Sequence, residues 1–379
     1  MTEIPELVLG LFAAPGGRPF AGLPTARNVL LILVDGLGWP IFEQLRDRLP
    51  RLTGFSAPIR TQFPSTTAAN VTTLHTGLTV GETGLYEWIV HEPSLDALVA
   101  PLMYSYAKDT TRDTLLPAAP DPLRLLPFGT VYQRLADAGV PSTVHQSAKF
   151  TPSTFSSVVL RPAALAGYDT ITGAIANVVA DLARPGPRYS VLYVNEMDAV
   201  AHISGPESAQ YREKATQVLR ELDAMLAALP AGTVVLLTAD HGHVAMDPDT
   251  TVHLNELWPA LPDLLRRWSV EPQTGPAGSP RDCFLHVREA DTANDIAKEL
   301  RSRLDGVATV HLTDELIDEG VFGDRVTGRL RERVGEIVVL PAPGETVWWK
   351  DPLYPNVFRG HHGGLSDAEM LIPLCAQVL

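Results

Sequence analysis

The sequence predicts an α/β fold: a doubly wound, mainly parallel sheet flanked by helices. Three short apolar runs, residues 28–36, 190–198 and 233–242, each end abruptly in polar residues. Runs this continuous are typical of strands buried on both faces. Helical patterns such as residues 130–139 and 211–229 separate them, and strands that alternate with helices indicate a parallel sheet.

Each of the three apolar runs ends in an aspartate, namely Asp35, Asp198 or Asp240. In parallel α/β sheets, ligands bind beyond the carboxyl ends of the strands. The three aspartates are therefore candidates for a single site. The alternative for each of them is an ordinary role in capping a turn or a helix.

A second unit is expected near the C-terminus. Residues 281–315 read as a strand, a helix and another strand, and a segment rich in Pro, Gly and Ser precedes them. We interpret this region as a small inserted α+β cap subdomain. The predicted division is a core of residues 1–254 and 346–379 with a cap of residues 255–345.

Composition narrows the class of protein. The chain has 379 residues and a formal net charge of −14, which disfavours binding to nucleic-acid polymers and anionic membranes. No apolar run reaches the length of a membrane span. Glu3 and Glu6 stand where a secretory signal would carry basic residues, so we expect a cytoplasmic protein. Cys283 and Cys375 are too few and too far apart for a disulfide framework or a thiolate metal site.

The segment from Pro64 to Gly77 is expected to present a nucleophile. Pro64 ends the preceding segment, and the residues after it can form a helix as far as Gly77. Thr67 then lies in the first turn, where free N–H groups favour a phosphate or an alkoxide. Asn70, three residues on, shares a helix face with the Thr67 hydroxyl. The alternative is an ordinary helix start rich in Ser and Thr.

Histidines accompany the aspartates. Asp198 and His202 are four residues apart and face the same side of a helical turn. Asp240 and His241 are adjacent at a strand end, where Gly242 permits a tight turn. Two further histidines near the C-terminus, His361 and His362, stand between glycines. A lone histidine is more often structural, but here carboxylates and imidazoles come from four separate segments.

Mixed carboxylate and imidazole ligands suit Zn²⁺, with Mn²⁺ or Fe²⁺ as alternatives. Sites for Mg²⁺ or Ca²⁺ would use oxygen ligands throughout. The candidate ligands are Asp35, Asp198, His202, Asp240, His241 and His361 or His362.

With these motifs in order along the chain, the sequence resembles the alkaline phosphatase superfamily and, within it, the nucleotide pyrophosphatase/phosphodiesterase (type I phosphodiesterase) family. The resemblance covers the core from Asp35 to the C-terminal histidines, but not the cap. One departure is Ala68-Ala69, where the family often has Phe-Pro. The matching motifs are Thr67–Asn70 with Thr76-Gly77, Asp198-x-x-x-His202-x-x-Gly205-Pro206, Asp240-His241-Gly242 and His362-Gly363.

The resemblance implies an alkaline phosphatase-like core that holds two divalent metal ions. His362 is preferred to His361 because it directly precedes the glycine. Asn70 would hydrogen-bond a phosphoryl oxygen. One ion would be held by Asp198, His202 and His362, and the other by Asp35, Asp240, His241 and Thr67.

The expected activity is hydrolysis of phosphodiester or nucleotide pyrophosphate bonds in small molecules through a phospho-threonine on Thr67. A metal-bound hydroxyl has a lowered pKa, which the threonine needs because its motif offers no base. Three aspartates against two divalent ions leave one positive charge, which favours a diester over a monoester dianion. Arg60 and Arg359 lie near motifs, although none of the matched motifs contains a substrate-facing arginine.

Two alternatives stay open. One is a phosphonoacetate hydrolase or phosphomonoesterase of the same superfamily. The other is a non-catalytic, metal-stabilised binding protein, which an intact nucleophile argues against. Tyr86 and Trp88, which follow the nucleophile segment, could contribute to a specificity pocket or to the core.

Overall fold

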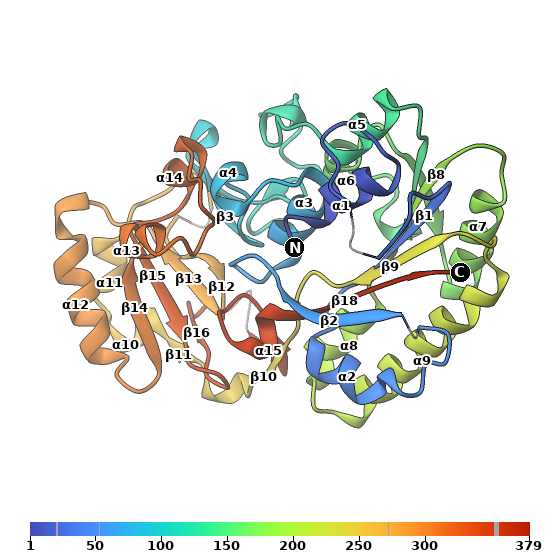
Figure 1. Ribbon diagram of the computed structural model, residues 1–379. Coiled ribbons are helices and arrows are strands. Elements are labelled where there is room, and N and C mark those ends of the chain that lie inside the picture. Colours follow the sequence, from blue (N-terminus) through green and yellow to red (C-terminus); the bar gives the residue numbers. More distant parts are fainter. Residues whose placement is uncertain (20–21, 53, 272, 352–355) are drawn as a thin grey trace.

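A seven-stranded sheet lies at the centre of the computed structural model, which describes residues 1–19, 22–52, 54–271, 273–351 and 356–379 (Figure 1). Six of its strands run parallel to one another, and β18 alone is antiparallel to its neighbours. The predicted mainly parallel α/β fold is thus confirmed. In spatial order the strands are β2 (Phe55–Arg60), β18 (Leu371–Val378), β9 (Val234–Thr238), β1 (Asn28–Val34), β8 (Arg188–Val194), β6 (Ser142–Ser147) and β7 (Ala164–Tyr168).

The three apolar runs of the sequence form neighbouring strands. Strand β1 pairs in parallel with β8 on one side and with β9 on the other, and every residue of β1 is buried. Alternate β1 side chains enter two different hydrophobic cores, Leu31 and Leu33 on one face and Leu30 and Ile32 on the other. A strand covered on both faces needs apolar residues at every position, which explains the unbroken run.

Helices cover both faces of the sheet (Figure 1). The two groups contribute to the two separate hydrophobic cores that flank β1. The first core includes α1 (Ile4–Leu11), α3 (Thr67–Thr76), α5 (Val131–Asp137) and α6 (Thr154–Val159). The second includes α2 (Trp39–Arg46), α7 (Ile171–Leu182), α8 (Glu196–Ser204) and α9 (Ala209–Met225).

One predicted boundary was wrong. Strand β8 ends at Val194, and Asp198 lies in the first turn of α8 rather than at a strand end. Polar Asn195 and Glu196 end the buried run, so the chain turns into a helix there. Because Asp198 and His202 both lie on α8, their four-residue spacing still places them on one helix face.

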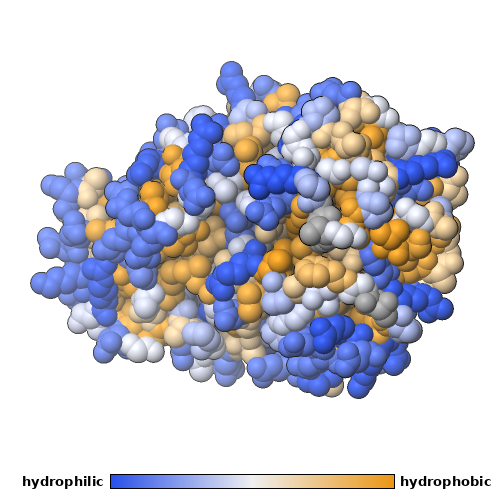
Figure 2. All heavy atoms as spheres, viewed as in Figure 1, coloured by the Kyte–Doolittle hydropathy of each residue, from blue (hydrophilic) through white to orange (hydrophobic). Residues whose placement is uncertain are grey.

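The predicted strand, helix and strand of the cap are present as β13 (Asp282–Leu285), α12 (Ala293–Arg303) and β14 (Ala308–Leu312). They belong to an antiparallel four-stranded sheet that also contains β12 (Ala277–Ser279) and β15 (Ile337–Pro341). A third hydrophobic core lies between this sheet and α12. The outward side of α12 is hydrophilic (Figure 2). The exact division at residues 254 and 346 stays a prediction.

Short elements connect these two sheets. A small three-stranded sheet follows the nucleophile helix, and two-stranded pairings lie between the core and the cap. No helix in the described part of the chain is long and apolar enough to cross a membrane. The remaining elements are α4 (Val80–Thr83), β3 (Val90–Glu92), β4 (Ala97–Ala100), β5 (Ser105–Tyr106), β10 (Val244–Ala245), β11 (Val252–His253), α10 (Leu254–Leu257), α11 (Leu261–Leu264), α13 (Thr313–Asp318), α14 (Gly328–Arg333), β16 (Val347–Trp348), β17 (Gly360–His361) and α15 (Asp367–Met370).

A buried ion pair joins the cap sheet to the core. Arg281, in the turn between β12 and β13, contacts both carboxylate oxygens of Glu369 on α15, at 2.9 and 3.0 Å. The side chains are 1% and 0% exposed. Arg281 also donates to the carbonyl oxygens of Ala342 and Glu345. The buried guanidinium of Arg281 therefore has acceptors for its N–H groups, which a buried charge requires.

We expect Arg281→Met to lower the free energy of unfolding by about 3–5 kcal/mol, because it leaves the Glu369 carboxylate buried without its partner. Denaturant titration followed by circular dichroism measures this loss. Arg331→Met is the matched control, since Arg331 pairs with Asp314 at the surface and an exposed pair contributes at most about 1 kcal/mol. Equal losses in the two variants would contradict the structural role of the buried pair.

Candidate active site

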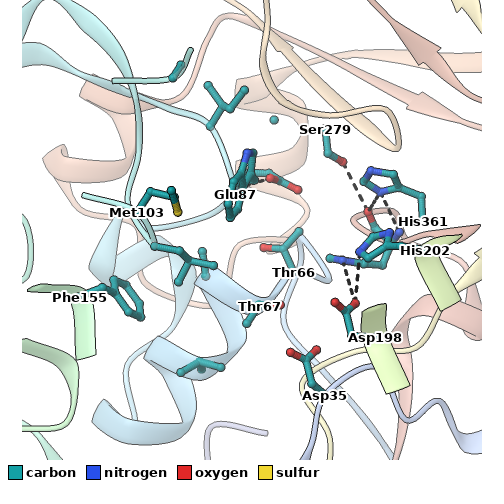
Figure 3. Close-up of a pocket in the computed structure, with 18 of the residues that line it drawn as sticks. Asp35, Thr66, Thr67, Glu87, Met103, Phe155, Asp198, His202, Ser279 and His361 are labelled. Atoms are coloured by element: carbon teal, nitrogen blue, oxygen red, sulfur yellow. Dashed lines mark hydrogen bonds and ion pairs between the residues drawn. The ribbon is translucent and has the colours of Figure 1, made fainter. Parts of the chain in front are cut away.

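The predicted site residues gather at the carboxyl ends of the central strands. Asp35 directly follows β1, and Asp240 and His241 follow β9. Thr67 begins α3, whose N-terminus points toward the same place (Figure 3). They border a cavity of about 820 Å³. Its wall includes Asp35, Thr67, Asp198, His202, His361 and His362, while Asp240 and His241 are fully buried behind it.

The first group of ligand atoms centres on Asp198. Its Oδ1 lies 3.2 Å from Nε2 of His202 and 3.8 Å from Nε2 of His362. Nε2 of His243 lies 3.0 Å from the same oxygen. Atoms of these four residues lie within 4.8 Å of one another. One carboxylate oxygen and three imidazole nitrogens at this spacing can hold a transition-metal ion.

The second group centres on His241 and includes the candidate nucleophile. Nε2 of His241 lies 3.1 Å from the Thr67 hydroxyl, 3.4 Å from Oδ1 of Asp35 and 3.5 Å from Oδ2 of Asp240. These two carboxylate oxygens are buried and have no hydrogen-bond partner among the described residues. Burying such atoms unpaired is costly. A cation between them would remove the cost, so the residues fit a metal ion.

The other oxygen of each carboxylate is held by the protein. Tyr193 donates its hydroxyl to Oδ2 of Asp35. Oδ1 of Asp240 accepts the backbone N–H groups of Gly36 and His241, both at 3.1 Å. These hydrogen bonds orient the two carboxylates. The other oxygen of each carboxylate lies near Nε2 of His241. Such outer contacts fix ligands before a metal binds.

The histidine rings are oriented in a similar way. The Nδ1 atoms of His202 and His362 lie 2.9 Å from carbonyl oxygens, and that of His241 lies 3.1 Å from one. A carbonyl oxygen can only accept, so Nδ1 carries the proton and Nε2 is left as the free ligand atom. The acceptors are the carbonyl oxygens of Gly360, Ser65 and Gly242 respectively.

The side chains around the site act in opposite directions on two of its carboxylates, Asp35 and Asp198. Burial, followed by the negative charges of Asp240 and Asp198, raises the pKa of Asp35 well above its usual value. Burial also works against ionisation of Asp198, but the His202 and His243 imidazoles outweigh it and hold the pKa of Asp198 well below its usual range. Divalent cations would offset the burial and the negative charges that raise the pKa of Asp35.

His243 belongs to the first group, and sequence reasoning missed it. The sequence interpretation ended at Gly242, although His243 follows two residues after His241. The alternating spacing Asp240-His241-Gly242-His243 was the available signal. Its Nδ1 is buried and has no hydrogen-bond partner in the described part of the chain.

The structure also distinguishes the two adjacent histidines. His362 contributes to the first group of ligand atoms. His361 pairs with Val244 in the short β17–β10 ladder, and its Nδ1 contacts the His362 carbonyl at 2.9 Å. His361 lines the cavity without joining either group. The role of His362 as a metal ligand stays a prediction.

Asn70 does not reach the cavity, which corrects its expected catalytic role. Its side chain is fully buried, and its Nδ2 donates to the carbonyl oxygens of Gln62, Pro64 and Thr66. Its Oδ1 accepts the Gln62 N–H. No amide hydrogen is left for a phosphoryl oxygen. Asn70 instead fixes the segment that leads into Thr67, because these contacts replace helix and strand bonds that the turn lacks.

Other expected residues divide between core and cavity. Tyr86 is fully buried and donates to the Arg333 carbonyl oxygen, so it belongs to the core. Trp88 lines the cavity and is 46% exposed. Arg60 pairs with Asp367 outside the cavity. Neither Arg60 nor Arg359 is among the residues of the cavity wall in the described part of the chain.

Comparison with known proteins finds one family model and several solved structures similar to the chain. The family model described as "Type I phosphodiesterase / nucleotide pyrophosphatase" matches residues 29–365. No curated protein matches the chain. Among solved structures, murine ectonucleotide pyrophosphatase/phosphodiesterase 5 superposes with a TM-score of 0.69 at 16% identity, covering 92% of this chain and 88% of that one.

Two further solved structures are similar. The human protein of the same name gives a TM-score of 0.70 at 15% identity, with 92% of this chain and 87% of that chain covered. An inactive variant of the murine protein in complex with AMP gives 0.69 at 15% identity and the same coverage. At these identities the likeness establishes a shared fold.

We expect His243→Ala to weaken divalent-cation binding at the first group by about 10–100-fold, because the variant loses one nitrogen and the group that orients Asp198. Competition with a chromophoric chelator, with Zn²⁺ as the probe, measures the affinity. His311→Ala provides a control on β14 of the cap. Unchanged Zn²⁺ affinity in the His243 variant would exclude this residue from the metal site.

Proposed function

Because the chain belongs to the type I phosphodiesterase/nucleotide pyrophosphatase family, we propose that it hydrolyses phosphodiester or nucleotide pyrophosphate bonds of small molecules, with Thr67 as nucleophile and two divalent cations as cofactors. The observation that carries the proposal is the Thr67 hydroxyl beside His241, 3.1 Å from its Nε2. Two unpartnered carboxylate oxygens lie next to the same imidazole nitrogen.

The two groups of ligand atoms correspond to two cation sites. Bound divalent cations would lower the pKa of the threonine hydroxyl and neutralise charge on the entering and leaving oxygens. The mixed nitrogen and oxygen donors favour Zn²⁺, with Mn²⁺ or Fe²⁺ as alternatives. We assign Asp198, His202, His243 and His362 to one ion, and Asp35, Asp240, His241 and Thr67 to the other.

Thr67 is placed to attack a phosphoryl group. It is the first residue of α3, in the helical turn whose backbone N–H groups have no partner within the helix. These groups and the positive helix end favour the negative charge that develops during attack. Attack on phosphorus would give a phospho-threonine and release the first alcohol or phosphate. Water would then hydrolyse this intermediate and restore the hydroxyl.

The cavity supports a substrate with a large organic group. Its wall carries the aromatic rings of Trp88, Trp348 and Phe358 and many aliphatic side chains. Apolar walls with a few polar groups are typical of sites for small organic ligands. The AMP complex of a structural neighbour is compatible with a nucleotide substrate. The single net positive charge left by three aspartates and two divalent ions favours a phosphodiester over a phosphomonoester dianion.

Thr67→Ala is expected to lower kcat for a nitrophenyl phosphodiester by about a thousandfold or more, because the hydroxyl that forms the intermediate is removed. Thr67→Ser keeps a hydroxyl and should retain part of the activity. Release of nitrophenol by the Zn²⁺-loaded protein measures both. Thr216→Ala on α9 is the control, and near-wild-type turnover by Thr67→Ala would refute the nucleophile assignment.

Substrate class is tested with matched compounds. We expect Zn²⁺-loaded protein to cleave a nitrophenyl phosphodiester with a higher kcat/KM than the corresponding monoester or phosphonoacetate, because two divalent ions would exceed the three aspartates by only one positive charge. Removal of the metal with a chelator should abolish the activity, and Zn²⁺ should restore it. Fastest turnover of the monoester or of phosphonoacetate would overturn the assigned substrate class.

A further inference from the structure

One lysine and one arginine of the described residues line the cavity, and only the lysine is paired with a carboxylate. Lys108 and Arg112 both belong to the segment after β5. Nζ of Lys108 lies 2.9 Å from Oδ2 of Asp351, which lines the same cavity. Arg112 forms no ion pair with any of the described residues, and its contacts are a backbone oxygen and an aromatic ring.

Arg112 is held in the cavity wall by a segment distant in sequence. Its Nη1 donates to the Lys149 carbonyl oxygen at 2.8 Å, and its guanidinium carbon lies 5.1 Å from the centre of the Phe150 ring. Lys149 and Phe150 follow β6, whose carboxyl end lies at the same edge of the sheet as that of β1. Stacking on an aromatic face orients a guanidinium without using its N–H groups. Most of the N–H groups of Arg112 thus remain available to a ligand.

The nearby carboxylate of the same wall, Asp109, does not pair with Arg112. Residue Asp109 is exposed, and its Oδ2 accepts the hydroxyl of Thr114. The protein has a formal net charge of −14, so carboxylates are abundant. The positive charge of Arg112 nevertheless has no acidic partner in the part of the chain that the structure describes. The cavity wall therefore keeps one uncompensated cation.

Arg112 belongs to the end of the cavity that lies away from the metal-binding groups. Figure 3 shows Met103 on the side of Thr67 that faces away from Asp198. The carbonyl oxygen of Met103 accepts the N–H of Asp113, the residue that follows Arg112. A substrate in this cavity can therefore meet divalent cations beside Thr67 and a separate cation, Arg112, near Met103.

An unpaired guanidinium in a cavity wall favours an oxyanion. Its N–H groups match two oxygens of a carboxylate or of a phosphate, and such charge-assisted hydrogen bonds are stronger than neutral ones. The apolar side chains of Met103 and Phe150 line the cavity together with Arg112. Apolar surroundings reduce the screening of a charge by water, which strengthens its attraction for an anion.

We propose that Arg112 determines specificity by binding a second anionic group, a carboxylate or a phosphate, on the ester portion of a phosphodiester. The substrate then carries one negative charge at the phosphorus that Thr67 attacks and another at a distance from it. This inference rests on the proposed function and narrows it, because phosphodiesters with a neutral ester group leave Arg112 without a partner.

Two pairs of nitrophenyl phosphodiesters test the proposal. In each pair the second ester group ends in a carboxylate or in the carboxamide of the same shape, on an ethyl spacer in one pair and a pentyl spacer in the other. With Zn²⁺-loaded wild-type protein, kcat/KM for the carboxylate should exceed that for its carboxamide by about fivefold to tenfold with at least one spacer, a ratio between those of an exposed ion pair and of a protected charge-assisted hydrogen bond. Arg112→Gln should bring the members of each pair within about twofold of each other.

Arg124→Gln is the matched control, because it removes the same charge from an exposed residue that is not part of the described cavity wall. It should preserve the wild-type ratio. An unchanged ratio in Arg112→Gln would overturn the proposal, as would an equal change in Arg124→Gln. An equal loss of turnover for all four compounds in Arg112→Gln would show that Arg112 only fixes its loop, which would also reject the proposal.

Binding separates this proposal from the proposed function. Calorimetric affinities of the four compounds for the Zn²⁺-loaded Thr67→Ala protein, with and without Arg112→Gln, should give the same order without turnover. If the wild-type protein hydrolyses none of the compounds, the proposed function fails, while the affinity ratio still tests Arg112. Equal affinities within both pairs would reject the role of Arg112 even if hydrolysis occurs. A phosphate on the better spacer, measured in the same way, identifies which of the two oxyanions Arg112 prefers.

Discussion

The crowding of three carboxylates, two of them buried, beside the ends of the central strands is the constraint on which the site depends. Asp35 and Asp240 follow the neighbouring strands β1 and β9, and Asp198 lies in the first turn of α8, the helix that follows β8. Like charges at this distance, shielded from water, oppose folding unless protons or cations neutralise them. The protein orients one oxygen of Asp35 and one of Asp240 and leaves the other free. A site organised in this way gains stability from the cations that its chemistry requires.

The cap and the metal-binding loops are joined through Glu369. Its carboxylate accepts from Arg281 of the cap hairpin and from the Gly364 N–H, close to His362. Its backbone oxygen accepts the Gly242 N–H, next to His241. Glu369 thus contacts the cap hairpin, the segment after His362 and the loop after His241. A shift of the cap hairpin would therefore displace candidate ligands of both metal-binding groups. This connection explains why a charged pair is retained where apolar residues would cost less to bury.

Much of this arrangement could be predicted from the sequence. The unbroken run at residues 28–34 and the pattern of strands and helices fixed the class of sheet, and strand-end placement brought Asp35 and Asp240 together. The limits of prediction were local. His243 was missed because its ring reaches Asp198 only through a loop conformation, and Asn70 was misassigned because its backbone partners lie in a turn before the helix. Side-chain contacts across segments distant in sequence carry no periodic signal, and the Arg281–Glu369 pair between cap and core is of this kind.

The distribution of charge explains how an acidic chain can act on anions. The net charge of −14 repels polyanions at long range, but the field inside the cavity depends on a few groups. Two divalent ions would exceed the charge of three aspartates by one unit, enough for one phosphodiester monoanion. A monoester dianion would bring more negative charge to phosphorus than this balance neutralises, so the charge at the ligand atoms favours a diester.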